Sequence, residues 1–334
     1  MTLIRRHFLQ LSVGAVTFPF VTTVAAVRPN TKHPRMGVIL NGGPGPVFDK
    51  LRQSFGQLGY VNGRNVLFEP RFANERLDRV PEFVAELISL NADVIVAVGI
   101  VAARAAQKAT TTIPIVFAMV VDPIAVGIVK TLGRPGGNVT GITSFDPQQP
   151  KKQFELLKAV IPKLARVAIL SDPDIPHSEA DPGWSPIERA NDTAARTLGL
   201  QPQLFKVKGI NPDLDGVFAA IRKEGSAALV ILEVPATRRH QVRIAELAAK
   251  HRLPTMFPGD WQSAGGLITY GTSIVNTFPR LAEYVDKILK GAKPADMPVE
   301  INTRRRLGFN VKTARAIGVR IPRELLERAD QITE

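Results

Sequence analysis

The chain has 334 residues, of which 45% are hydrophobic and 22% charged, and its formal net charge at pH 7 is +13. This balance excludes a disordered chain, because enough apolar side chains are present to build cores, and the length suits two domains. The chain has no cysteine, which excludes disulfides, thiolate catalysis and cysteine metal ligands.

The N-terminal segment, residues 1–26, is predicted to be an export signal rather than part of the fold. A pair of arginines at residues 5–6 precedes an apolar run at residues 11–24, and small residues follow up to Ala26. A charged start, a moderate apolar run and a small-residue end are typical of secretory signals. The run is too short, and too interrupted by Pro19, for a membrane span. We expect cleavage near Ala26 and a periplasmic protein, exported by the twin-arginine or the general route.

From residue 36 the chain alternates apolar runs rich in branched residues, which predict strands, with segments of helical periodicity. The expected strands of this first part are residues 36–40, 65–72, 93–98, 115–119 and 139–143. The expected helices are residues 47–58, 77–90, 100–110, and one that begins at Asp122-Pro123 with Ile124, Ile128 and Leu132 on one face.

The same alternation then repeats. The next expected helices are residues 153–161, 186–198, 213–223, 237–251 and 277–290, and the strands are 166–170, 202–207, 227–232, 254–257, 267–270 and 307–310. Such alternation implies parallel sheets covered by helices on both faces. We therefore predict an α/β fold of two similar lobes, residues 36–143 and 144–270. The sequence does not assign the segment 271–334 to either lobe.

Several short motifs carry a resemblance to a known family. They are Ile113-Pro114-Ile115-Val116-Phe117, Asp122-Pro123, Arg134-Pro135-Gly136-Gly137-Asn138-Val139-Thr140-Gly141, and the segments 198–200, 264–267 and 288–296. Together they resemble the substrate-binding proteins of ABC transporters, of the tryptophan/tyrosine-binding-like kind. The resemblance implies a periplasmic-binding type I-like fold, with two lobes joined by a multi-strand hinge. It also implies a small-molecule ligand and an ABC permease in the inner membrane as partners, and we expect a monomer.

Two crossings between the lobes are expected, at residues 141–144 and 270–272. Gly141 and Gly271 lie in these segments, and glycine tolerates backbone angles that other residues avoid. The crossings could therefore absorb the rotation of hinge closure, in which a ligand stabilises the closed state.

Ligands of open parallel sheets bind beyond the carboxyl ends of the strands. This rule selects as candidate ligand-binding residues Asn41, Gly43, Pro44, Gly99, Asp122, Thr143, Ser171, Asp172, Glu233, Asp260 and Tyr270. Helices that begin after these ends favour a carboxylate, whereas Asp122, Glu233 and Asp260 could hold an amine. We expect a carboxylated or zwitterionic ligand, with an amino acid as one possibility.

Structural alternatives exist for these candidates. Asp122 could be only a helix cap, Gly99 could serve a tight turn, and Ser171-Asp172-Pro173 could be turn chemistry. Members of the resembled family often have Asn-Pro at the position of Asp172-Pro173, and a serine near Gly43. These departures leave the identity of the ligand open.

The sequence lacks the usual motifs of catalysis, such as G-x-x-x-x-G-K-[ST], G-x-S-x-G and H-E-x-x-H. Its five histidines have no metal-ligand spacing, and the densest basic run, at residues 304–306, lacks interleaved aromatics. We expect no catalytic residue, metal, cofactor or nucleic-acid partner. The alternative is a small-molecule enzyme on a similar scaffold, with Asp122 and Glu233 as its acid–base pair. A sugar-responsive regulator would need a helix-turn-helix before residue 36, where the signal segment stands.

Overall fold

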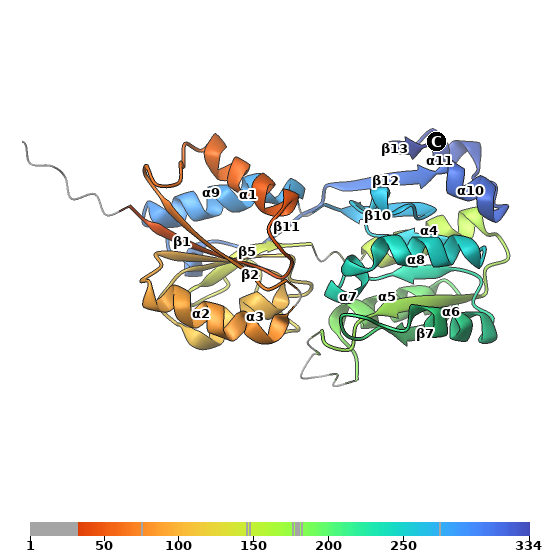
Figure 1. Ribbon diagram of the computed structural model, residues 1–334, viewed down its shortest axis with the longest axis horizontal. Helices are drawn as coiled ribbons and strands as arrows, with labels where there is room; N and C mark the ends of the chain where they lie inside the picture. The colour runs from red at the N-terminus through yellow and green to blue at the C-terminus, as the bar shows by residue number, and fades with distance from the viewer. Residues whose placement is uncertain are drawn as a thin grey trace, which may run out of the picture. The chain divides into compact units, whose positions relative to one another are not determined.

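The computed structural model describes residues 33–74, 76–144, 146, 148–175, 177, 181, 183–273 and 275–334. Residues 33–334 form one compact unit, and the described strands within it make two sheets (Figure 1). The predicted signal segment at residues 1–26 lies outside the described residues. We call the part built on the first sheet lobe 1 and the part built on the second sheet lobe 2.

The sheet of lobe 1 has the order β11-β5-β4-β3-β1-β2, and all its strand pairs are parallel. Its central strands are short runs of branched apolar residues that are fully buried, as expected for a parallel sheet covered on both faces. The strands are β1 (Arg35–Leu40), β2 (Leu67–Phe72), β3 (Val94–Val98), β4 (Ile115–Ala118), β5 (Val139–Thr143) and β11 (Glu300–Ile301).

Helices cover both faces of this sheet. In Figure 1, α1 (Pro46–Gln57) and α9 (Phe278–Leu289) lie on one face, and α2 (Val80–Ser89) and α3 (Ile100–Ala109) lie on the other. The first pair packs on the core that contains Phe55 and the second on the core that contains Phe117. Because α9 comes late in the chain, lobe 1 is completed only after the chain has passed through lobe 2.

The sheet of lobe 2 has the order β13-β12-β10-β9-β8-β6-β7. Its pairs are parallel except β10 with β12, which is antiparallel. Its strands are β6 (Arg166–Ser171), β7 (Gln201–Lys206), β8 (Leu229–Ile231), β9 (Thr255–Phe257), β10 (Ile268–Thr272), β12 (Arg305–Asn310) and β13 (Gln331–Thr333). The second lobe is therefore also built on a mostly parallel sheet, as the sequence predicts for an α/β fold.

Two buried clusters flank this sheet. One contains side chains of α4, α5, α10 and α11, and the other contains side chains of α6, α7 and α8. The helices are α4 (Gln148–Val160), α5 (Pro186–Thr197), α6 (Leu214–Lys223), α7 (Pro235–Arg239), α8 (Gln241–Lys250), α10 (Val311–Ile317) and α11 (Arg323–Leu326), and short 3-10 turns are η1 (Leu77–Arg79), η2 (Gln262–Ala264), η3 (Val275–Thr277) and η4 (Pro294–Asp296).

The prediction that a helix begins at Asp122-Pro123 is wrong. The Asp122 Oδ1 does accept a hydrogen bond from the Ala125 N–H at 3.0 Å, so a cap is present. The turn that it starts ends at once, because Gly127 adopts a φ of 70° and residues 123–128 form only turns and a bend. Ile124, expected on a buried face, is 46% exposed.

Other boundaries also differ from the prediction. The helix expected at residues 237–251 is two helices that meet at His240, and the helix expected at residues 153–161 begins at Gln148. The C-terminal segment divides between the lobes, because β11 joins the first sheet whereas β12 and β13 join the second. The two short strands β11 and β13 were not predicted, since a run of two or three residues has no readable period.

The two glycines predicted to act as hinges lie inside strands. Gly141 belongs to β5, where an added Cβ would come within 2.3 Å of the Phe117 carbonyl oxygen, so it allows close packing of β4 on β5. Gly271 belongs to β10 and has a φ of 153°. Proline cannot adopt that angle, so a proline at this position would break β10.

Candidate ligand-binding site

A cavity of about 300 Å³ is lined by residues of both lobes. Lobe 1 contributes the loop that follows β1, at residues 41–45, and the residues that follow β3, at 99–101. Lobe 2 contributes residues that follow β6 and β8. The cavity therefore lies at the carboxyl ends of strands from both sheets, as the rule for parallel sheets predicts, and its volume suits a small molecule.

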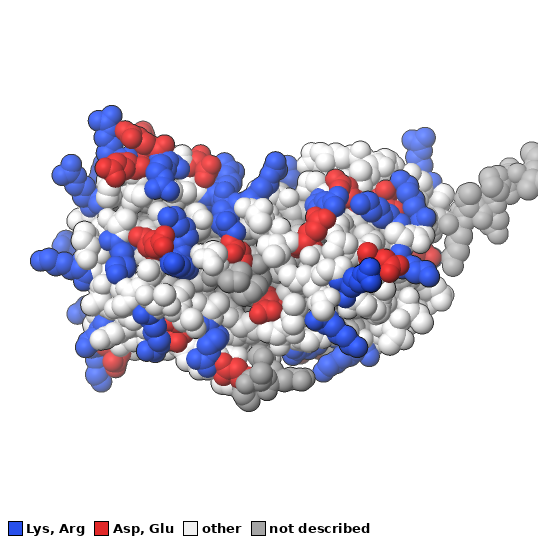
Figure 2. All heavy atoms as spheres, turned by 180° about the vertical axis from the view of Figure 1, so that it is seen from behind, with Lys and Arg blue, Asp and Glu red and all other residues white. Residues whose placement is uncertain are grey.

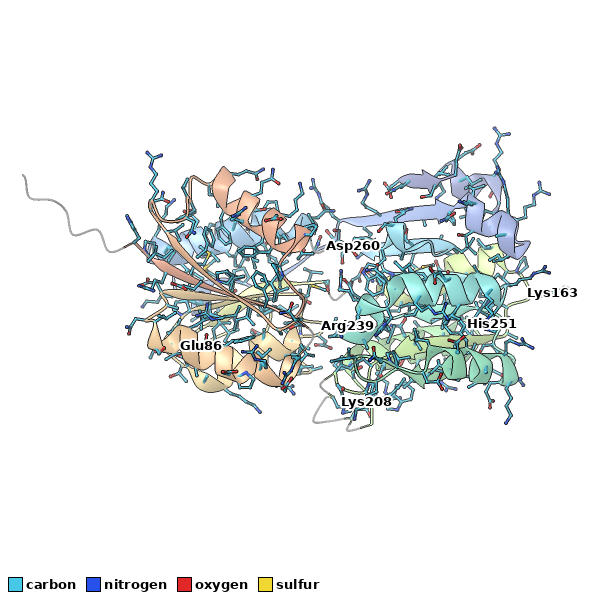
Figure 3. All side chains as sticks on the ribbon, viewed as in Figure 1. Glu86, Lys163, Lys208, Arg239, His251 and Asp260 are labelled. Atoms are coloured by element: carbon cyan, nitrogen blue, oxygen red, sulfur yellow. The ribbon has the colours of Figure 1, made fainter. Side chains whose placement is uncertain are left out.

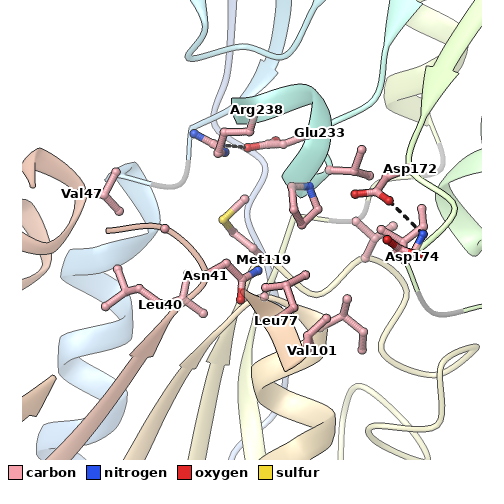
Figure 4. A pocket seen from close by; sticks show the side chains of 18 of the residues that line it. Leu40, Asn41, Val47, Leu77, Val101, Met119, Asp172, Asp174, Glu233 and Arg238 are labelled. Atoms are coloured by element: carbon pink, nitrogen blue, oxygen red, sulfur yellow. Dashed lines mark hydrogen bonds and ion pairs between the residues drawn. The ribbon is translucent and has the colours of Figure 1, made fainter. Parts of the chain in front are cut away.

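Most of the side chains that line the cavity are apolar (Figure 4). They include Leu40, Val47, Leu77, Ile100, Val101, Met119, Val121, Val126, Ile175, Ile187 and Val234. The polar groups are few, which is the usual pattern of a site that buries the body of a small ligand and orients it with a few fixed contacts.

Four helices begin at the cavity, and their N-termini differ between the lobes. In lobe 2 a side chain caps the first turn of each helix: Ser185 and Glu188 form a capping box on α5, and the Ala236 N–H of α7 donates to Asp172 at 3.1 Å. In lobe 1 neither α1 nor α3 has a side-chain cap. The helix starts without a side-chain cap are therefore on the lobe 1 side, where their N–H groups and positive dipole ends suit an anionic ligand group.

Glycine is required at the start of α3. Gly99 has a φ of 98°, an angle that favours glycine, and a Cβ there would lie 2.7 Å from the Asn41 Nδ2. The lack of a side chain therefore lets Asn41 lie against the helix start. Both residues line the cavity, and the Asn41 Oδ1 is buried without a hydrogen-bond partner.

A charged cluster stands on the lobe 2 side of the cavity. The Arg238 guanidinium pairs with Glu233, lies 4.0 Å from the Asp260 carboxylate, and stacks 5.1 Å from the centre of the Trp261 ring. Figure 4 shows the pair of Arg238 with Glu233. Burial raises the pKa of Glu233 to about 7, Arg238 opposes this rise, and Asp260 adds to it. Burial likewise raises the pKa of Asp172.

Six of the eleven predicted site residues line this cavity. They are Asn41, Gly43, Pro44, Gly99, Asp172 and Glu233. Asp172 also has a structural role, because its two oxygens accept from the Asp174 and Ala236 N–H groups at 2.9 and 3.1 Å.

Within the described part of the chain, the other five predicted residues are not among those that line the cavity. Asp122 caps the turn after β4, and the Thr143 hydroxyl donates to the Val120 carbonyl at 2.6 Å. Ser171 is fully buried at the end of β6, and Tyr270 packs on the core of lobe 2. Asp260 lies 4.0 Å from the Arg238 guanidinium and also adds to the rise in the pKa of Glu233.

Sequence reasoning missed Arg238 and the apolar residues of the helix starts. Arg238 lies in α7, about one turn after Glu233. The sequence signal that could have identified it is a carboxylate followed by an arginine near the end of a strand.

In Figure 3, Arg239 and Asp260 lie at one end of lobe 2, whereas His251 and Lys163 lie at the opposite end. His251 ends α8 and stacks on Phe218 with 5.7 Å between the ring centres, away from the cavity.

The described residues hold no group of three or more His, Asp or Glu side chains arranged to bind a metal ion. In the same residues, no helix combines the length and the apolar character that a membrane crossing requires. Lysine and arginine side chains are interspersed with acidic ones over the face in Figure 2.

Comparison with known proteins identifies the family. The profile of the family described as ABC transporter substrate binding protein matches residues 46–333. A tyrosine-binding protein of Clostridioides difficile is 24% identical over 282 residues, which cover 81% of this chain and 77% of that protein.

Two solved structures share the fold. A conserved domain protein from Vibrio cholerae is 24% identical with a TM-score of 0.80, covering 90% of this chain and 100% of the other. A domain from Streptococcus pneumoniae in complex with L-Trp is 22% identical with a TM-score of 0.78, covering 89% and 99%. Since the family profile covers most of the chain, this protein belongs to the ABC transporter substrate-binding protein family.

Proposed function

We propose that this protein is exported and serves as the solute-binding component of an ABC importer. It captures a small carboxylated or zwitterionic molecule in the cavity and delivers it to a permease in the inner membrane. The proposal includes removal of the signal segment near Ala26, a periplasmic location and a monomeric state. No covalent chemistry is needed for this role.

The observation that carries the ligand class is the pairing of an apolar cavity with the uncapped N-termini of α1 and α3. The cavity would bury an apolar body, and the helix starts would bind a carboxylate. The names of the tyrosine-binding relative and of the L-Trp complex support an aromatic amino acid within this class. The proposed polar contacts are Asn41, Asp172 and Glu233 from the sequence, and Arg238 in addition, with Gly43, Pro44 and Gly99 as backbone contacts.

Closure of the lobes over the ligand is part of the proposal. The crossings between the sheets lie between β5 and α4, between β10 and α9, and between β11 and β12. One contact already joins the lobes beside the cavity: the Arg239 guanidinium donates to the Asn74 carbonyl at 3.1 Å. Ligand contacts made with both lobes would favour the closed state over the open one.

A panel of ligands tests this function. Thermal shift followed by calorimetry should detect binding of carboxylates or amino acids with an apolar body, and each bound compound should be recovered chemically unchanged. Val101→Arg places a charge in the apolar cavity and should abolish binding. The control Val242→Arg changes a side chain that is 54% exposed and should bind normally.

Binding of neutral sugars alone, with no response to any carboxylate, would exclude the proposed ligand class. Conversion of a bound compound to product would favour the enzyme alternative, with Glu233 as the first residue to replace.

Export is tested separately by mass spectrometry of the full chain expressed in a bacterial host. The periplasmic fraction should contain a product that begins near residue 27. If the whole product keeps Met1 and stays in the cytoplasm, the proposed location is wrong.

A further inference from the structure

A second, smaller cavity of about 60 Å³ shares Met119, Val121, Ile187 and Glu233 with the larger one. We call it the annex. It is several times larger than the ~10–15 Å³ that one water molecule requires. Unlike the larger cavity, the annex has many polar side chains among its lining residues: Ser144, Asp146, Gln149, Gln153, Asn191, Glu233 and Thr272.

Two of the residues that line the annex have an amide oxygen that is buried without a hydrogen-bond partner. Asn191 is only 2% exposed, and its Nδ2 donates to the Ile187 carbonyl at 2.8 Å. This bond fixes the orientation of the amide and leaves its Oδ1 without a hydrogen bond. The Gln149 Oε1 is also buried and unpartnered. Unpaired buried acceptors are costly, so a donor that reaches both would be bound favourably.

The charges around the annex also favour a cation. Asp146 and Glu233 line it, and each is paired with an arginine, Arg305 and Arg238 respectively. Arg238 is shared with the nearby Asp260. Because burial raises the pKa of Glu233 to about 7, a cation bound in the annex would favour the ionised form of Glu233 and would be balanced by it.

We infer that the annex binds the ammonium group of the ligand, with the Asn191 Oδ1 and the Gln149 Oε1 as acceptors and Glu233 as the nearest carboxylate. An ammonium group has three donors and no acceptor, which matches this set. The inference rests on the proposed function and narrows its ligand class to amines with an apolar body. The carboxylate of such a ligand would face the uncapped helix starts of lobe 1.

Matched pairs of compounds test the inference. L-Tryptophan is compared with 3-(indol-3-yl)propanoate, and L-tyrosine with 3-(4-hydroxyphenyl)propanoate, each pair differing only in the amino group. Calorimetry on the wild type should show tighter binding of the amine in at least one pair. A hydrogen bond to a charged group corresponds to a change of about 10- to 100-fold in affinity. Asn191→Leu should therefore weaken binding of the amine by about this factor and change binding of its partner little.

Two further variants keep the test independent of folding. Gln149→Met alters a partly exposed side chain and should also reduce the preference for the amine. Asp192→Asn changes the next residue of α5, whose carboxylate accepts a hydrogen bond from Arg196 and does not line the annex. This variant should bind the amine and its desamino partner as the wild type does.

The outcomes are separable. Equal binding of amine and desamino compounds, or an unchanged preference in Asn191→Leu and Gln149→Met, would overturn the role of the annex and leave the proposed function standing. Failure of every compound in the wider panel to bind would overturn the proposed function and the annex with it.

Discussion

Replacing Arg305 by leucine is expected to lower the free energy of unfolding by about 3 kcal/mol. Arg305 begins β12, directly after the crossing from lobe 1, and its guanidinium pairs with the Asp146 carboxylate at the start of another crossing. The Asp146 side chain is only 11% exposed. Without the arginine, its charge would be left in a poorly solvated position with no cation. Denaturant unfolding at pH 7 measures the loss.

Two controls separate this charge effect from a general effect of the substitution. The neighbouring Arg306 is exposed, so Arg306→Leu should change stability by no more than about 0.5 kcal/mol. The double variant Asp146→Leu/Arg305→Leu should recover most of the loss, because it removes both charges together. If Arg305→Leu costs no more than Arg306→Leu, the pair does not stabilise the crossings.

The strands that define the fold could be predicted because their residues are apolar without interruption. The runs at β3 and β4 are buried on both faces, as strands in the interior of a covered parallel sheet are. The C-terminal strands could not be found in this way. β11 has only two residues, and it exists because β5 offers it an edge, which is a tertiary effect.

The failed helix after β4 shows the limit of periodic patterns. The proline and the capping Asp122 are real start signals, and the turn begins as they predict. The spacing of Ile124, Ile128 and Leu132 suggested a continuation, but Gly127 takes a positive φ within the first turn and ends it. A glycine inside a short apolar pattern should have counted against the helix.

Residues that line the cavity could be predicted where they follow the end of a strand. Asn41, Gly99, Asp172 and Glu233 line the cavity, and this placement could be predicted because parallel strands place their carboxyl ends on one edge of a sheet. Asn191, which lines the smaller cavity, was not predicted, because it lies in the middle of α5 and its direction depends on how that helix packs. The structure shows that α5 buries Glu188, Asn191 and Asp192 together with Ala194 and Ala195, so its buried side is partly polar.

Replacing Glu233 by glutamine is expected to remove much of the pH dependence of stability between pH 5 and pH 8. Burial raises the pKa of Glu233 to about 7 from its usual 4.5, and the two charged groups that face it are Arg238 and Asp260. The folded protein thus keeps a proton that the unfolded chain releases in this range. The contribution of Glu233 to the free energy of unfolding is therefore fully present below about pH 4.5 and is lost as the pH rises to about 7.

From pH 5 to pH 8, the free energy of unfolding should fall by about 2–3 kcal/mol more in the wild type than in Glu233→Gln. Other carboxylates titrate in both proteins alike, so the difference isolates Glu233. The control Glu246→Gln, at a side chain that is 60% exposed, should follow the wild type. Parallel curves for wild type and Glu233→Gln would mean that Arg238 keeps Glu233 ionised throughout, and the ligand's ammonium would then meet a permanent carboxylate in the annex.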